Sequence, residues 1–135
     1  MNTTAQPLIY LVDDDLDEHF LLQKIFNRHH TDCTLRYFTD GAELVTHLTH
    51  CLDGRLPNLI VLDWNLPVLS GTQVLQLLKQ DCQWRGIPVV VRSGSEQEND
   101  IKSSYELGAQ AFIMKAGNYQ QLVNSVTALR YRCLN

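Results

Sequence analysis

The chain has 135 residues, of which 44% are hydrophobic and 19% charged, a composition typical of one folded domain and not of a disordered segment. Its formal net charge of −4 argues against a protein built mainly to neutralise the phosphates of a nucleic acid. The longest apolar runs, residues 59–62 and 87–91, are too short to cross a bilayer, and residues 1–7 do not resemble a secretion signal, so we expect a cytoplasmic protein without membrane spans.

Five short apolar runs alternate with stretches of helical spacing. In chain order the runs comprise residues 8–12, 34–38, 59–62, 88–91 and 111–114. Runs of this length and character are typical of parallel strands that are buried on both faces. Apolar residues recur three or four positions apart in the segments that follow, in the sets Phe20, Leu21, Ile25 and Phe26; Val74, Leu77 and Leu78; and Leu122, Val126 and Leu129. These sets predict the buried faces of helices.

Signals for helix ends lie where this alternation needs them. Residues 40–43, 70–73 and 95–98 each place an Asp or Ser three positions before a Glu or Gln, which is the pattern of a capping box. Gly108 follows a helical stretch and precedes a strand, as a glycine at a helix C-terminus does. Five strands that alternate with helices predict an α/β fold, in which helices cover both faces of a parallel sheet.

Polar residues follow four of the five predicted strands. Residues 13–15 are three consecutive aspartates after the first strand, and Asp63 and Asn65 follow the third. Ser93 follows the fourth strand and Lys115 the fifth. Because the carboxyl ends of parallel strands meet at one edge of a sheet, we expect these side chains to form one polar site.

This set of residues is suited to phosphoryl chemistry on a carboxylate. Clustered acids repel one another unless a cation neutralises them, and a site that offers only oxygen ligands favours Mg²⁺ over zinc. A carboxylate can act as the nucleophile and form an aspartyl-phosphate. The Lys115 amine would offset charge on the phosphoryl oxygens, and the Ser93 hydroxyl could donate to one of them. Each group alone has an ordinary reading as a turn, a helix cap or a surface residue, so the hypothesis rests on their coincidence at one edge.

In order and spacing, these motifs resemble the receiver domain of two-component response regulators, from about residue 8 to residue 134. By that resemblance Asp63 would be the phosphoacceptor, within a motif that continues to Pro67 and Gly71. Asp14 would bind Mg²⁺ directly and Asp13 through water.

The same resemblance assigns the other site residues. The carbonyl of Asn65 would complete the metal site. Ser93 would be the switch hydroxyl, Lys115 the partner of the phosphoryl group, and Phe112 the aromatic side chain that turns inward after phosphorylation.

The resemblance also implies a fold and a function. The fold would be a doubly wound, five-stranded parallel sheet in the order 2-1-3-4-5, the flavodoxin-like receiver fold, with residues 1–135 as a single receiver domain and no output domain. The partners would be a histidine kinase or histidine phosphotransfer protein upstream and an unidentified protein downstream. Homodimerisation would be compatible with the resemblance. The chain would catalyse only its own phosphorylation and dephosphorylation and would not otherwise be an enzyme.

Three positions depart from the family pattern. Ser93 stands where threonine is commoner, and Ala116 replaces the usual proline after Lys115, which leaves the cis or trans state of that bond open. A lysine followed by a small non-proline residue, with residues 104–107 upstream, resembles the small response regulators that partner cyanobacterial phytochromes and their relatives. Arg92 is charged where an apolar residue is usual, and the sequence supplies no account of it.

Other classes of protein fit the sequence less well. A phosphatase of the haloacid-dehalogenase type has a second carboxylate where this chain has Asn65. A pseudo-receiver would keep the fold for binding alone, and Ala116 keeps that alternative open. A flavin site lacks support because no loop rich in Ser, Thr or Gly follows the first strand. His47 and His50, with the adjacent Cys51, sketch a zinc site, but an incomplete ligand set favours a solvated helix face.

Overall fold

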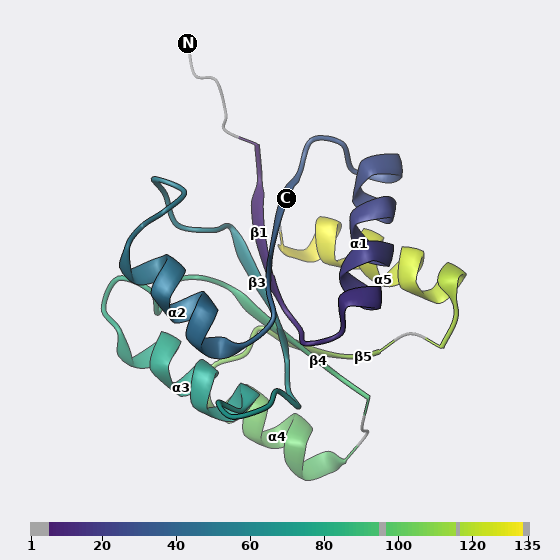
Figure 1. Cartoon of the computed structure of the whole chain (residues 1–135). Helices are drawn as coiled ribbons and strands as arrows, with labels where there is room; N and C mark the ends of the chain where they lie inside the picture. The colour runs from purple at the N-terminus through teal and green to yellow at the C-terminus, as the bar shows by residue number, and fades with distance from the viewer. Residues whose placement is uncertain (1–5, 95–96, 116, 134–135) are drawn as a thin grey trace.

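The computed structural model describes residues 6–94, 97–115 and 117–133, in which strands and helices strictly alternate (Figure 1). The strands are β1 (Leu8–Val12), β2 (Thr34–Phe38), β3 (Leu59–Asp63), β4 (Val89–Ser93) and β5 (Ala111–Met114). The helices are α1 (Leu16–His29), α2 (Gly41–Thr49), α3 (Gly71–Gln80), α4 (Glu98–Glu106) and α5 (Tyr119–Cys133). None of the helices in this part of the chain has the length and apolar character needed to cross a bilayer.

The strands form one parallel sheet in the order β2-β1-β3-β4-β5, which confirms the predicted fold class and strand order. Helices α1 and α5 cover one face of the sheet, and α2, α3 and α4 cover the other (Figure 1). A parallel sheet needs such crossover helices because each chain return must run from one end of the sheet to the other. All carboxyl ends of the strands therefore lie at one edge.

Alternation along each strand divides the core into two layers. On β1, Leu8, Tyr10 and Val12 face α2, α3 and α4, whereas Ile9 and Leu11 face α1 and α5. Both sets are at most 2% exposed, so the strand is buried on both faces. This burial explains why the strands appeared in the sequence as continuous apolar runs.

Two of the three predicted capping boxes lie at the start of a helix, one of them complete and the other half-formed. At α3, Ser70 Oγ accepts from Gln73 N and the Gln73 side chain accepts from Ser70 N, so the box is complete. At α2, Asp40 accepts from Glu43 N, but the Glu43 carboxylate binds Thr39 instead of the Asp40 backbone. The α2 cap is therefore half a box.

The third box was placed wrongly. Helix α4 begins at Glu98, with Gln97 as its N-cap, and not after Ser95, which lies with Glu96 outside the described residues. The end of α4 agrees with the prediction. Gly108 has a φ of +106°, a conformation that glycine adopts at little cost, and its N–H donates to Tyr105 O at 3.1 Å.

Two residues assigned to buried helix faces are exposed. Phe20 is 64% exposed on α1, where Leu22 is buried instead, and Leu77 is 42% exposed on α3, where Leu75 is buried. Both helices carry apolar residues on more than one face, so spacing alone did not select the face that packs on the sheet. On α5, by contrast, the predicted Leu122 and Val126 are buried, and Leu129 packs against them.

Candidate functional site

The carboxyl ends of β1 and β3 bring three carboxylates together. Asp13, Asp14 and Asp63 each place one oxygen within 4.8 Å of the oxygens of the other two. Asp13 and Asp63 are buried, whereas Asp14 is exposed to solvent. Across the described ranges, no other set of three His, Cys, Asp or Glu side chains offers such a group. Because only oxygens are on offer, the cluster fits a hard divalent cation.

The backbone of each loop holds its own buried carboxylate. Asp13 Oδ1 accepts a hydrogen bond from Asp15 N at 2.9 Å, and Asp63 Oδ1 accepts one from Asn65 N at 3.0 Å. Aspartate commonly accepts such a bond from the amide two residues later. These bonds fix one oxygen of each carboxylate and leave the second, Oδ2, for contacts across the site.

Lys115 supplies a cation to both buried carboxylates. Its Nζ lies 3.0 Å from Asp63 Oδ2 and 3.5 Å from Asp13 Oδ2, and its backbone N–H donates to Ser93 O at 2.9 Å. Burial lowers the pKa of Lys115, but the hydrogen bond to Asp63 and the charges of both carboxylates raise it more, so the net shift is upward. The amine therefore stays charged at neutral pH. The sequence left open whether the peptide bond between Lys115 and Ala116 is cis or trans, and Ala116 lies outside the described residues.

The neighbouring groups compensate the negative charge of the buried Asp13 carboxylate only in part. Burial raises its pKa above the ordinary value, and the nearby Asp63 charge adds to this, whereas the Asp15 N–H, Lys115 and Arg92 lower it less. Asp13 Oδ2 is buried and accepts no hydrogen bond from the described residues. A buried carboxylate oxygen without a donor is costly, and a cation bound at this point would relieve that cost. The residues present thus fit a metal ion.

Ser93 ends β4, and Phe112 lies near the start of the adjoining strand β5, in register with Val91. Ser93 is fully buried at the end of β4, and its Oγ accepts a hydrogen bond from Asn65 Nδ2 at 3.4 Å. Phe112, on β5, is partly buried against the core layer beneath α2, α3 and α4. Its N–H donates to Tyr105 Oη of α4 at 3.1 Å. Sequence reasoning missed this role of Tyr105, because the contact depends on how α4 packs beside β5.

The start of α3 presses against the backbone that carries Asp63. A Cβ at Gly71 would lie 2.7 Å from Trp64 Cα, 2.8 Å from Asp63 O and 2.9 Å from Trp64 O. Gly71 N also donates to Trp64 O at 3.2 Å. Glycine is thus required here for a close approach between two backbones. Trp64 itself is buried in the core, directly beside the predicted phosphoacceptor.

Arg92 is the one charged side chain within the described residues that is buried behind the acidic cluster on β4. It is 3% exposed; its Nη2 lies 3.2 Å from Glu18 Oε2, and its Nη1 lies 3.8 Å from Asp13 Oδ2. The sequence showed an unusual charge at this position. It did not show the partner Glu18, which is 74 residues away and belongs to the first turn of α1.

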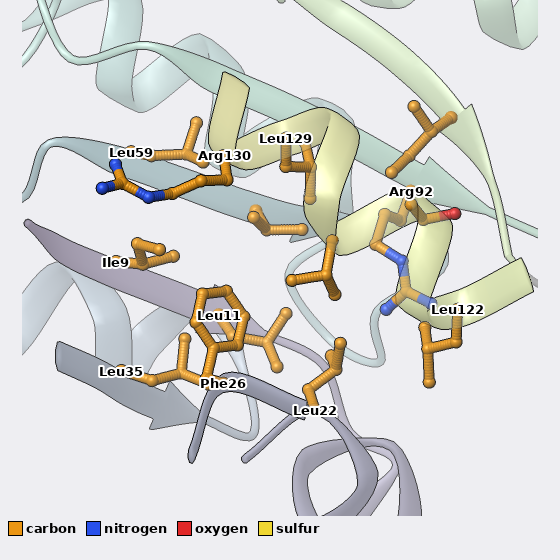
Figure 2. Close-up of a pocket in the computed structure, with 14 residues that line it drawn as sticks. Ile9, Leu11, Leu22, Phe26, Leu35, Leu59, Arg92, Leu122, Leu129 and Arg130 are labelled. Atoms are coloured by element: carbon orange, nitrogen blue, oxygen red, sulfur yellow. The ribbon is translucent and has the colours of Figure 1, made fainter. Parts of the chain in front are cut away.

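Arg92 also borders a small cavity between the sheet and α5. The cavity measures about 20 Å³ and is lined mainly by aliphatic side chains, with Arg92 toward one end and Arg130 toward the other (Figure 2). A space of this size holds about one water molecule. It is therefore a feature of core packing, and the chemistry of the chain is concentrated at the acidic cluster.

Among the described residues, His47 of α2 and His50, which follows the helix, do not form a metal-binding group with Cys51. His47 Nε2 lies 2.6 Å from Asp53 Oδ2, and Asp53 also accepts hydrogen bonds from Tyr10 Oη and Arg36 Nε. Burial raises the pKa of Asp53, but hydrogen bonds from Tyr10, His47 and Arg36 lower it more, so the net shift is downward. His50 and Cys51 are exposed. The zinc alternative finds no ligand set among the described residues, although His47 is partly buried and not on a solvated face as we had expected.

Comparisons with known proteins place the chain among its relatives. Residues 9–127 match the response regulator receiver domain family. Response regulator Rcp1 of Synechocystis sp. is 33% identical over 125 residues, which cover 90% of this chain and 85% of Rcp1. The crystal structure of Mn²⁺-bound Rcp1 superimposes with a TM-score of 0.83 at 32% identity, covering 93% of each chain. The phosphorylated cyanobacterial phytochrome response regulator RcpA gives a TM-score of 0.89 at 33% identity, covering 97% of this chain and 96% of RcpA.

Proposed function

The chain belongs to the response regulator receiver domain family, with phytochrome-associated response regulators among its relatives, and we propose that it is a Mg²⁺-dependent phosphoacceptor whose reactive group is Asp63. The observation that carries the proposal is the contact of Lys115 Nζ with Asp63 Oδ2 at 3.0 Å beside the three-carboxylate cluster. The donor would be a histidine kinase or histidine phosphotransfer protein. Given the relatives, a phytochrome-class kinase is the first candidate.

The reaction would be an in-line displacement at phosphorus. A carboxylate oxygen of Asp63 attacks the phosphorus of a phosphohistidine, and the P–N bond breaks as the P–O bond forms. The imidazole leaves with the electron pair of the P–N bond and takes up a proton from solvent. Lys115 keeps the Asp63 carboxylate oriented before the transfer and pairs with a phosphoryl oxygen after it.

A divalent ion held by Asp13, Asp14, Asp63 and the carbonyl of Asn65 would supply the positive charge that the phosphoryl oxygens need. Mg²⁺ is proposed because the ligands are oxygens, and Mg²⁺ sites are usually completed by water and phosphate. The Mn²⁺-bound form of Rcp1 is consistent with a divalent site in this family.

The output would be a shift between two arrangements of the same residues. The Ser93 hydroxyl, which now accepts from Asn65, would donate to the phosphoryl group, and Phe112 would turn into the space that Ser93 leaves. The hydrogen bond between Phe112 N and Tyr105 Oη would pass this change to α4. A downstream protein, or a second copy of the chain, would then bind the altered surface. The setting would be the cytoplasm.

The test is intact-protein mass after incubation with phosphoramidate, with and without Mg²⁺. We expect the wild-type chain to gain one phosphoryl group only with Mg²⁺, and Asp63→Asn to gain none. Asp100→Asn, which removes a carboxylate on α4, is the matched control and should react like the wild type. Lys115→Ala should still accept the phosphoryl group, but the resulting conformational change should reach a partner or a second copy of the chain poorly.

A folded wild-type chain that takes no phosphoryl group from phosphoramidate, acetyl phosphate or a phosphorylated kinase would contradict the proposal. That result would favour a pseudo-receiver that signals by binding alone. Turnover of small phosphate esters would instead revive the phosphatase alternative.

A further inference from the structure

Arg92 is a permanent cation behind the acidic cluster. It follows Val91 on β4 and pairs in register with Asp63 of β3, but its side chain extends toward α1. It is 3% exposed, so water screens its charge poorly. A buried arginine is tolerated only with carboxylate partners, and here these are Glu18 and Asp13.

The two partners hold Arg92 unequally. Glu18 Oε2 lies 3.2 Å from Nη2, within hydrogen-bond distance, whereas Asp13 Oδ2 lies 3.8 Å from Nη1. Arg92 Nη1 and Asp13 Oδ2 are both buried, and neither has a hydrogen-bond partner among the described residues. The pair of Arg92 and Asp13 is thus an attraction of charges without a hydrogen bond.

One oxygen of Asp13 is held by its own loop and not by Arg92. Asp13 Oδ1 accepts from Asp15 N at 2.9 Å, and this bond belongs to the loop itself. The contribution of Arg92 to Asp13 is therefore its charge. That charge favours the ionised carboxylate in the absence of a metal ion and opposes any second cation that approaches the same oxygen.

From this arrangement we infer that Arg92 is a built-in competitor of the divalent cation, which weakens metal binding at Asp13 and so sets the affinity of the acidic cluster. The inference rests on the metal site proposed above and adds the residue that tunes it. Glu18 controls the strength of the competition, because its hydrogen bond holds the guanidinium away from Asp13.

The decisive measurement is calorimetric titration of Mg²⁺ and Mn²⁺ into the apo protein. Arg92→Met removes the charge and keeps the apolar stem, and it should lower the dissociation constant for Mg²⁺ by about tenfold or more. Arg92→Lys retains the charge and should stay within about threefold of the wild type. Circular dichroism and thermal unfolding establish that each variant is folded.

Glu18→Gln tests the same inference from the side of α1, at a partly exposed position where the substitution leaves the core unchanged. Without the Glu18 carboxylate, Arg92 has only Asp13 as an anionic partner, so we expect Mg²⁺ binding to weaken by about threefold. In the double variant with Arg92→Met, the weakening should largely disappear. A purely long-range effect of the Glu18 charge would persist there undiminished.

Three results would overturn the role of Arg92. The first is a folded Arg92→Met variant that binds Mg²⁺ no more tightly than the wild type, and the second is equal tightening by Arg92→Lys. The third is absence of metal binding in every variant. Phosphorylation measured by mass separates this inference from the proposed function. Tighter metal binding without any phosphoryl transfer would support Arg92 alone, whereas Mg²⁺-dependent transfer with affinities insensitive to Arg92 would support the phosphoacceptor alone.

Discussion

Gly71→Ala should disturb both the stability of the chain and the position of Asp63. The new Cβ would lie 2.7 Å from Trp64 Cα, so the two backbones must separate by roughly 0.8 Å to restore an ordinary carbon–carbon contact. The neighbouring atoms are backbone atoms of the loop after β3, and they cannot turn aside as a flexible side chain can. Such overpacking costs about 1–3 kcal/mol, and the better helix propensity of alanine offsets less than about 1 kcal/mol of that. We expect a net loss of about 1–2 kcal/mol.

The assay pairs thermal unfolding with the phosphorylation rate. For a chain of this size, a loss of about 1–2 kcal/mol corresponds to a fall in Tm of roughly 3–10 °C. Displacement of Asp63 relative to Lys115 should also slow phosphorylation by phosphoramidate by about tenfold or more, since reacting groups tolerate little misplacement. Gly86→Ala is the matched control, because a Cβ at Gly86 meets no atom within 4 Å.

The reasoning fails if Gly71→Ala and Gly86→Ala unfold at the same temperature and react at the same rate. That result would mean that the loop after β3 shifts to accommodate the new Cβ without a loss of stability or reactivity. A loss of stability without slower phosphorylation would show that α3 moves and the Asp63 loop stays in place.

Four further substitutions test other parts of the structure. Val68 is fully exposed with a φ of +63°, so Val68→Asn should relieve strain of about 1 kcal/mol and raise Tm by roughly 3–6 °C, measured by calorimetry. Asp53→Asn should cost about 2 kcal/mol of unfolding free energy in urea at pH 7. Because hydrogen bonds lower the pKa of Asp53 in the folded chain, that stabilisation is fully present above the unfolded value of about 4 and is lost as pH falls through the lower folded value, so the difference between wild type and variant should shrink with increasing acidity. Leu22→Ala should cost about 2–4 kcal/mol in the same assay, whereas Phe20→Ala, at an exposed position, should cost less than about 1 kcal/mol.

The strands were the most predictable part of this chain. Three of the five predicted strand ranges, those of β1, β2 and β5, coincide with the observed bounds. A central parallel strand is buried on both faces, so its sequence is mostly apolar, although β3 and β4 each run one or two residues beyond the apolar stretch, to Asp63 and Ser93. A helix needs only one apolar face. Phe20 and Leu77 satisfy the helical spacing as well as Leu22 and Leu75 do, and only docking on the sheet decides between them.

The gathering of acids was predictable because topology alone brings strand ends together. The individual contacts were not, because they depend on the rotation of helices about their axes. The sequence around Tyr105 did not predict a contact with β5, yet the Tyr105 hydroxyl accepts a hydrogen bond from Phe112 N across the junction of α4 and β5. Likewise, the sequence showed Arg92 as a charged residue in an apolar strand, but residue spacing did not predict its partner Glu18 on α1.

The loop after β1 explains why Arg92 finds Glu18 as well as Asp13. The Asp13 carboxylate accepts from Asp15 N, and the Asp15 carboxylate accepts in turn from Glu18 N as the cap of α1. This chain of hydrogen bonds links the Asp13 carboxylate to the first turn of α1. Arg92 therefore lies beside two carboxylates that these hydrogen bonds connect. We therefore expect the effects of substitutions at Arg92 and Glu18 on metal binding to be coupled to each other, and both to be lost when Asp13 is replaced by Asn.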